Sequence, residues 1–248
     1  MNAQCCLIAV GGTGYRLRKD DIRFPYSKSS LEVLGRPMLY WLLGALEKID
    51  IGKVVMTSER KDSLNFAREI VDKYFKNSFD VVYNLDFGFG SSGLPFQNKD
   101  LLDFPCFFEA GHSFQDSEHY KRMDGEYEEG CLVVSGFPPK GFAPRYTVKN
   151  EKEKVVYVGK KFSSTGEMEV GSPKLFGRDF VDILPRLGYD FDRIFPHYIS
   201  NDKLKIIPGS MPLEVDVKKE WEEAVPQYEN FILNFGWLNN KSKLEKVH

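Results

Sequence analysis

The sequence predicts an α/β fold, a single domain with a mixed, mostly parallel central sheet and helices on both faces. Strand and helix patterns alternate through the first half of the chain, the order that a parallel sheet requires. The second half has shorter strand patterns, two of which form a hairpin and add antiparallel strands. The 248 residues suffice for one such domain. We place it at residues 1–240, followed by a flexible C-terminal tail at 241–248.

The elements of the first half follow from hydrophobic periodicity. Short, continuous apolar runs are typical of buried parallel strands, and longer amphipathic stretches predict helices. Strands are expected at 5–10, 53–58, 79–85 and within 101–111, and helices at 36–49 and 58–75. Pro37 is expected in the first turn of the first helix, and Ser58 is the candidate N-cap of the second. The stretch DFGFGSSGLPF, at 86–96, is rich in glycine and serine and is expected to form a loop.

The second half is less regular. Strands are expected at 131–137 and 203–209, and the pair 145–150 and 154–160 reads as an antiparallel hairpin across a polar turn. Residues 175–187 are expected to be helical as far as Pro185. A C-terminal helix is expected at 217–238, with Pro226 inside it.

Charge and cysteine content exclude several classes of protein. The formal net charge is −2, so no overall field attracts nucleic acid or an anionic membrane. The four cysteines have no metal-ligand spacing and are expected to be buried, reduced thiols. The N-terminal sequence has no basic segment before its apolar run, and no run approaches the ~20 apolar residues of a membrane span. We therefore expect a cytoplasmic protein and leave open whether it is a homo-oligomer.

A glycine-rich turn follows the first predicted strand, in the sequence LIAVGGTGYRLRKDD at 7–21. Glycine permits positive φ and close approach of a ligand, and successive backbone N–H groups in such a turn can bind an anion. Arg16 and further basic residues follow, so the turn is a candidate cradle for a polyphosphate. The Walker A and dinucleotide-binding patterns do not fit it. Taken alone, the stretch also fits an ordinary turn after a strand.

Two blocks together resemble the signature of the sugar-phosphate nucleotidylyltransferases, a family with a GT-A-like, Rossmann-like fold. The matching residues of the turn are Gly11, Gly12, Gly14, Arg16 and Leu17. Those of the second block are Lys28, Leu31, Val33, Gly35, Arg36, Pro37 and Met38. Ser27 and Ser29 replace the prolines that flank the family's lysine. The likeness is strong over residues 7–47 and looser from 86 to 224.

The resemblance implies a reaction and a set of roles. A phosphate oxygen of a sugar-1-phosphate, or of a similar phosphorylated alcohol, attacks the α-phosphorus of an NTP, and pyrophosphate leaves. Arg16 and Lys28 would be the catalytic cations. The nucleotide would be held by Val10, Gly11, Gly12, Thr13 and Gly14 and, at the base, by Gly90, Ser91 and Ser92. Glu169 and Gly171 would contact the sugar.

The metal site implied by the resemblance departs from the family pattern. The family binds Mg²⁺ through two aspartates, and here Asp216 matches one whereas His112 replaces the other. Imidazole is a poor ligand for Mg²⁺. Three interpretations stay open: Asp216 holds the metal with help from Glu109 or Glu214, Mn²⁺ or Co²⁺ replaces Mg²⁺, or the protein binds a nucleotide without turning it over.

The sequence therefore favours a nucleotidylyltransferase, with a non-catalytic nucleotide-binding or regulatory relative as the alternative. Competing motifs carry less weight. The Asp190–Asp192 pair resembles a glycosyltransferase metal motif but does not follow a predicted strand. His112 and His119 have no third ligand at zinc spacing, and no G-x-S-x-G nucleophile motif is present. The nucleobase and the sugar are not evident from the sequence.

Overall fold

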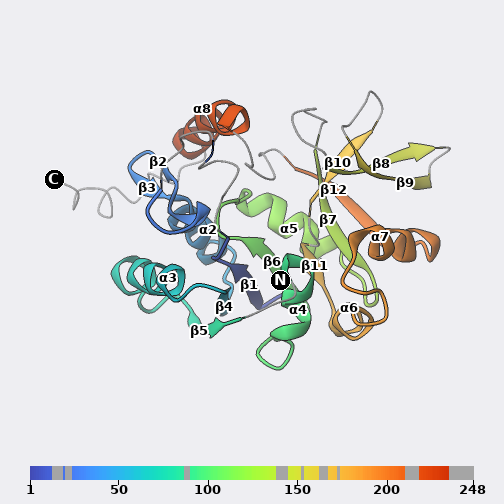
Figure 1. The fold of residues 1–248 in the computed structure, drawn as a ribbon, viewed down its shortest axis with the longest axis horizontal. Coiled ribbons are helices and arrows are strands. Elements are labelled where there is room, and N and C mark those ends of the chain that lie inside the picture. Colours follow the sequence, from blue (N-terminus) through green and yellow to red (C-terminus); the bar gives the residue numbers. More distant parts are fainter. Residues whose placement is uncertain are drawn as a thin grey trace.

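Within the described part of the chain, a ten-stranded mixed sheet forms the centre of the protein (Figure 1). The structure is a computed structural model. It describes residues 1–12, 19, 24–86, 90–137, 145–151, 154–161, 167–171, 174–209 and 218–234. The strands are β1 (Cys5–Ala9), β4 (Lys53–Ser58), β5 (Asp80–Leu85), β6 (Cys106–Ala110), β7 (Leu132–Phe137), β8 (Arg145–Glu151), β9 (Lys154–Lys161), β10 (Met168–Val170), β11 (Leu175–Phe176) and β12 (Leu204–Pro208).

The parallel half of the sheet is centred on β1. Strand β1 pairs with β4 on one side and β6 on the other, and β5 pairs with β4 at the edge, all in parallel. Strand β11 lies antiparallel between β6 and β7, so β7 runs in the same direction as β6. The five strands β1, β4, β5, β6 and β7 thus end at the same side of the sheet, which we call the carboxyl edge. Ligands of open α/β sheets bind at such an edge.

The antiparallel half of the sheet is built around β7, which pairs with β10, β11 and β12. Strands β10 and β11 follow each other along the same side of β7, where β10 also pairs with β8 and β11 also pairs with β6. The β8–β9 hairpin extends from β10, and β12 runs parallel to β7 on its other side. The predicted mixed, mostly parallel sheet with its antiparallel hairpin is confirmed.

Helices cover both faces, as predicted. One face is packed by α2 (Met38–Glu47), α3 (Lys61–Tyr74), α5 (Ser117–Glu126) and α8 (Lys218–Asn234). The other is packed by α4 (Gly90–Gln97), α6 (Arg178–Ile183) and α7 (Phe191–Ser200). The short elements η1 (Lys28–Ser30), β2 (Glu32–Val33) and β3 (Arg36–Pro37) precede α2. Although α8 follows β12 in sequence, it lies over the side that carries α2 and the β2–β3 hairpin (Figure 1).

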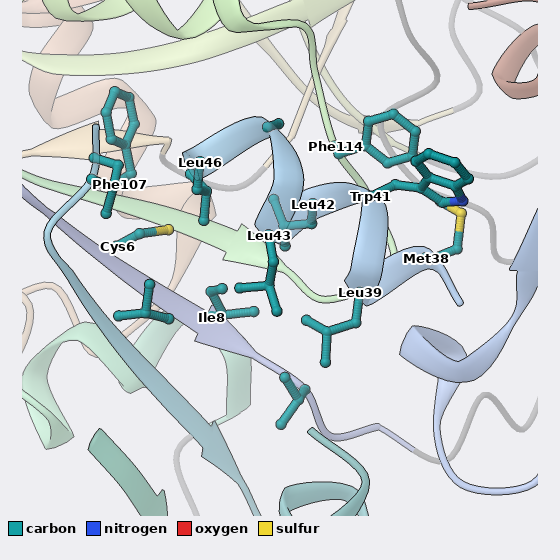
Figure 2. Close-up of a cluster of buried hydrophobic side chains, with 14 of the residues drawn as sticks. Cys6, Ile8, Met38, Leu39, Trp41, Leu42, Leu43, Leu46, Phe107 and Phe114 are labelled. Carbon is teal, nitrogen blue, oxygen red and sulfur yellow. The ribbon is translucent and has the colours of Figure 1, made fainter. Parts of the chain in front are cut away.

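The larger core forms where α2 packs on β1 and β6. Figure 2 shows the leucines of α2 beside Cys6 and Ile8 of β1 and near Phe107 of β6. Trp41 is buried and donates from its indole nitrogen to the Val33 carbonyl at 3.0 Å, which ties α2 to the preceding hairpin. Since each fully buried large apolar side chain contributes about 1.5–3 kcal/mol, this cluster fixes α2 against the middle of the sheet.

Several predicted boundaries are wrong at the start of a helix. Pro37 belongs to β3 and is the N-cap of α2, which begins at Met38. Ser58 ends β4, and the N-cap of α3 is Arg60, whose backbone N–H donates to the Ser58 hydroxyl at 3.0 Å. In both cases the residue still belongs to a paired strand, so the helix begins after the predicted position.

Four helical predictions also need correction. Residues 90–97 form α4 instead of a loop, although glycine and serine are weak helix formers, because the helix packs on the sheet. Leu175 and Phe176 form β11, and the helix that follows is α6. Helices α5 and α7 were not predicted, since SEHYKRMDGE is strongly polar and FDRIFPHYIS contains Pro196.

The cysteine prediction is confirmed, because Cys5, Cys6, Cys106 and Cys131 are all buried and free of disulfides. Burial raises the pKa of the Cys6 and Cys106 thiols well above the ordinary range. These thiols fill the core as small apolar side chains. Within the described parts of the chain, we find no helix with the length and apolar character that crossing a membrane requires.

Candidate functional site

The glycine turn begins at the carboxyl edge, immediately after β1. The Val10 N–H donates to the Thr57 carbonyl at 3.0 Å, which continues the β1–β4 pairing by one residue. A Cβ atom at Gly11 would lie 2.7 Å from Ser58 Oγ, so a side chain does not fit there without a shift of Ser58. Gly12 has φ +99°, a conformation that L-residues rarely adopt. The predicted residues Thr13, Gly14 and Arg16 lie outside the described part.

The Lys28 segment is held against the end of β1 by two serines. The Ser27 hydroxyl donates to the Val10 carbonyl at 2.6 Å, and the Ser29 hydroxyl, which lies 3.2 Å from the same carbonyl oxygen, is also within hydrogen-bonding distance of the Ser27 hydroxyl. Both serines are buried, and η1 places the half-buried Lys28 between them. These are the serines that replace the family's prolines. They fix the lysine's backbone by hydrogen bonds to the glycine turn itself.

The end of β6 packs against the same segment. The Gly111 N–H donates to the Ala9 carbonyl at 2.9 Å. A Cβ atom at Gly111 would lie 3.0 Å from Ser29 Cβ, so glycine is what allows this close approach. His112 follows directly and is half-buried. The structure therefore brings together three parts of the predicted site, namely the turn at Gly11 and Gly12, the Lys28 segment and the His112 position.

A buried ion pair lies next to this junction. Glu109 of β6 accepts a bond from the Lys174 ammonium, and both side chains are almost fully buried. The Tyr120 hydroxyl donates to Glu109 Oε1 at 3.2 Å, and Ser113 Oγ donates to Oε2 at 3.5 Å. Burial raises the pKa of the Glu109 carboxyl, and Lys174 opposes this shift. Both Glu109 oxygens are thus engaged inside the protein, which contradicts its assignment as a metal ligand.

Sequence reasoning missed Lys174. It precedes β11, and its backbone joins two strands, since its N–H donates to the Val133 carbonyl and its carbonyl accepts from the Phe108 N–H. The one available signal was a lysine directly before a short apolar strand, in the stretch SPKLFG. Its partner Glu109, three residues before His112, was considered only as a possible metal ligand.

The predicted base-contacting residues lie at the start of α4. Gly90 and Ser91 are exposed, and Gly90 has φ +62°. Ser92 is half-buried, and its hydroxyl donates to the Tyr189 carbonyl at 2.5 Å. This bond joins α4 to the segment before α7, so the Ser92 hydroxyl has a structural partner within the protein.

The predicted sugar contacts lie on the other side of β6. Glu169 is buried on β10, opposite Phe137 at the end of β7 and Thr147 of β8. It therefore sits at the carboxyl edge, which suits a substrate-binding residue. Gly171 is buried directly after β10 and lies two residues farther along the chain, away from the carboxyl edge.

The described residues do not by themselves fit a Mg²⁺ ion. Asp216 and Glu214 lie outside the described part, Glu109 is engaged by Lys174, and His112 offers an imidazole. Within the described ranges no group of three His, Cys, Asp or Glu side chains is placed to hold a metal. Mg²⁺ prefers oxygen ligands in near-octahedral geometry.

The second histidine considered, His119, has a structural role. It is fully buried on α5, where Nε2 lies 2.9 Å from Ser135 Oγ and Nδ1 lies 3.3 Å from Arg122 Nη2. Burial, assisted by the nearby Arg122 charge, lowers the pKa of His119 to about 4, so the ring is neutral at pH 7. It anchors α5 to β7.

Solved structures share this fold. The inositol-1-phosphate CTP transferase of T. maritima superposes with a TM-score of 0.69 at 14% identity, over 91% of this chain and 96% of the other. A Bacillus anthracis protein described as a glucose-1-phosphate thymidylyltransferase gives a TM-score of 0.73 at 14% identity, over 92% and 96% of the two chains. The 4-diphosphocytidyl-2C-methyl-D-erythritol synthase of Anaerococcus prevotii gives 0.60 at 16% identity, over 91% and 95%.

The chain thus has the fold of these nucleotidyltransferases along nearly its whole length, and the predicted fold class is confirmed. At the level of sequence, neither a protein-family model nor a curated protein matches it.

Proposed function

We propose that this protein is a nucleotidylyltransferase that couples an NTP to a sugar-1-phosphate or a similar phosphorylated alcohol. The observation that carries the proposal is the position of Lys28. Ser27 and Ser29 fix its backbone to the Val10 carbonyl at the start of the glycine turn, beside the end of β6. A cation is thereby held next to a turn whose backbone can approach a phosphate, within a fold that nucleotidyltransferases use.

The chemistry follows from this arrangement. An oxygen of the acceptor phosphate forms a bond to the α-phosphorus of the NTP. At the same time the bond between the α-phosphorus and the oxygen that bridges it to the β-phosphorus breaks. Pyrophosphate leaves with the electron pair. The backbone at Gly11 and Gly12 positions the nucleotide, and the Lys28 ammonium offsets negative charge that builds up between the two phosphates. Arg16, outside the described residues, is proposed to contact the leaving pyrophosphate.

A protein that binds a nucleotide without turning it over is the second candidate. The observation that favours it is the His112 position, where the described residues provide no carboxylate for Mg²⁺. We retain Asp216 and His112 as the proposed metal ligands and Glu169 and Gly171 as the proposed sugar contacts. The buried, free cysteines suit the cytoplasmic location that we propose.

The two candidates are separated by measuring pyrophosphate release. The protein is incubated with each NTP and a panel of sugar phosphates and related phosphorylated alcohols, with Mg²⁺, Mn²⁺ or Co²⁺. We expect release, and more of it with Mn²⁺ or Co²⁺ than with Mg²⁺, since affinity at a nitrogen ligand rises along that series. His112→Asp is expected to raise the Mg²⁺-supported rate. If neither the wild type nor His112→Asp releases pyrophosphate with any combination of NTP, acceptor and metal, the binding-only candidate is favoured.

Replacing Gly12 with leucine is expected to abolish NTP binding in calorimetry. A Cβ atom at Gly12 would meet no atom of the described residues within 4 Å, so the side chain would project toward the space where we place the nucleotide. The left-handed backbone adds about 1–2 kcal/mol of strain, which the fold should tolerate.

Gly159→Leu is the matched control for that variant. Gly159 lies on β9 with φ +100°, and its Cβ position is equally open. This control should carry the same strain and keep NTP affinity. Unchanged affinity in Gly12→Leu would remove the turn from the site.

A further inference from the structure

Strand β5 forms an open edge of the central sheet. It lies at one end of the strand order and, among the described strands, pairs with β4 alone (Figure 1). The N–H groups of Asp80 and Asp86 donate to carbonyls on the β4 side, at 2.7 and 2.9 Å. Backbone groups alternate along a strand, so those of Val81, Tyr83 and Leu85 point away from β4. A row of N–H and C=O groups of this kind is a template for another strand.

The residues of β5 do not protect this edge. Edge strands that stay unpaired commonly carry lysine, proline or a bulge. Strand β9, at the opposite end of the strand order, carries the exposed Lys160, and the β8–β9 register shifts between Thr147 and Val148. The sequence of β5, DVVYNL, contains no lysine or proline, and its register with β4 is regular from Asp80 to Leu85. The β5 edge is therefore suited to pairing.

The side chains along β5 complement themselves when two copies run antiparallel. A two-fold axis at Val82 places Val81 opposite Tyr83 of the other copy. It also places Phe79, which directly precedes the strand, opposite Leu85. Phe79, Val81 and Tyr83 are half-buried on the α3 side of the sheet, and Leu85 is 43% exposed. Apolar and aromatic residues thus face one another in this register, and such cross-strand pairs stabilise a sheet.

Two opposite charges on α3 lie beside this row. The Arg68 guanidinium lies over the Tyr83 ring, 4.8 Å from its centroid. Burial, assisted by the charge of Asp72 one helical turn farther along α3, raises the pKa of Tyr83 to about 12, and Arg68 opposes this shift. Both charged side chains are exposed. An antiparallel partner places its own Asp72 level with Arg68 and its own Arg68 level with Asp72, so each charge meets the opposite one.

We propose that two copies of this chain associate through β5, antiparallel about a two-fold axis at Val82, and form one continuous sheet. A second copy is favoured over an unrelated strand because the apolar row and the two charges are complementary to themselves, as a two-fold interface requires. The axis keeps both α3 helices on the same face of the joined sheet. The two carboxyl edges point in opposite directions, so the proposed nucleotide sites lie at opposite edges of that sheet.

Cysteine substitution tests the register. The backbone groups of Val82 point toward β4, so Val82 and its copy form a non-hydrogen-bonded pair with Cα atoms about 4.5 Å apart, within reach of a disulfide. Val82→Cys should therefore give a disulfide-linked dimer on a non-reducing gel when a mild oxidant is added to the purified protein. Val81→Cys is the matched control, because its own copy lies two residues out of step, beyond the reach of a disulfide. It should stay unlinked.

Charge reversal tests the identity of the partner. Arg68→Glu or Asp72→Arg alone should weaken the wild-type dimer about 10-fold or more, because each variant sets like charges across the axis twice. A mixture of the two variants should restore dimers, since each charge then faces its opposite. Sedimentation velocity of the wild type, each variant and the mixture measures this.

A lysine on the edge provides a second test by sedimentation. Leu85→Lys should weaken association, because it places a charge opposite the apolar Phe79 of the other copy. Leu233→Lys is the control, since Leu233 is an exposed leucine on α8 and takes no part in the proposed interface. This control should associate like the wild type.

These results decide for or against the interface without any measurement of nucleotide binding or turnover. A wild type that sediments as a monomer at every concentration, with no cross-link in Val82→Cys, overturns the proposal. Dimers that Leu85→Lys and both charge variants leave intact use another surface and overturn it as well. Cross-linking of Val81→Cys in preference to Val82→Cys contradicts the register. Thermal melting confirms that each variant is folded.

Discussion

Lys174→Met is expected to destabilise the protein by about 3–5 kcal/mol, because it leaves the Glu109 carboxylate buried without its cation. Both side chains are almost fully buried, and the remaining partners, Tyr120 and Ser113, are neutral. Methionine fills a volume similar to that of lysine, so the lost free energy of unfolding comes mainly from the missing charge and not from a cavity. Urea unfolding of the variant and the wild type measures it.

The double variant Lys174→Met with Glu109→Gln should recover most of that loss, since no charge is left buried. The pH dependence provides a second readout. Burial raises the pKa of Glu109, and removing Lys174 raises it further, so the folded variant retains a proton that the unfolded chain has released. The variant should therefore lose stability as pH rises above the ordinary glutamate pKa, about 4.3. A variant within about 1 kcal/mol of wild type at pH 8 would contradict this account of the pair.

Lys28→Ala is expected to lower kcat by about 10²-fold or more while changing KM little, by analogy with the loss of one preorganised charge-stabilising group. The reason is that a cation between two phosphates stabilises charge that is greatest in the transition state. The backbone that carries it is held by Ser27 and Ser29, so the truncation should not disturb the glycine turn.

Lys76→Ala serves as the control, because Lys76 is exposed before β5, at the opposite edge of the sheet. It should retain wild-type kinetics. A Lys28→Ala enzyme with near wild-type turnover would remove the lysine from the reaction. A raised KM with unchanged kcat would assign it to binding alone.

The parallel half of the fold could be predicted from sequence because its signals are local. Continuous apolar runs mark β1, β4 and β6, and the glycine turn after β1 predicts a ligand site there. The elements that were not predicted depend more on tertiary contacts. Helix α4 is made of weak helix formers and is stabilised by packing, and β11 is two residues long and exists only between β6 and β7.

The candidate site divides in the same way. The Gly11, Gly12 and Lys28 positions could be predicted because they fall in a recognisable pattern. The serines beside Lys28 were noted only as departures from that pattern, and the structure explains them by their bonds to Val10. Lys174 has its role only through Glu109, which lies 65 positions away in sequence, so that role could not be deduced from spacing.

The most direct test of the proposed nucleotidyl transfer uses an acceptor sugar phosphate labelled with ¹⁸O in its phosphate group. Mass spectrometry then follows the label after incubation with the preferred NTP. The account predicts that all of the label appears in a sugar nucleotide, with none in pyrophosphate, because the acceptor oxygen attacks the α-phosphorus. Unlabelled nucleoside monophosphate as the product, or no product with any acceptor despite tight NTP binding, would contradict it.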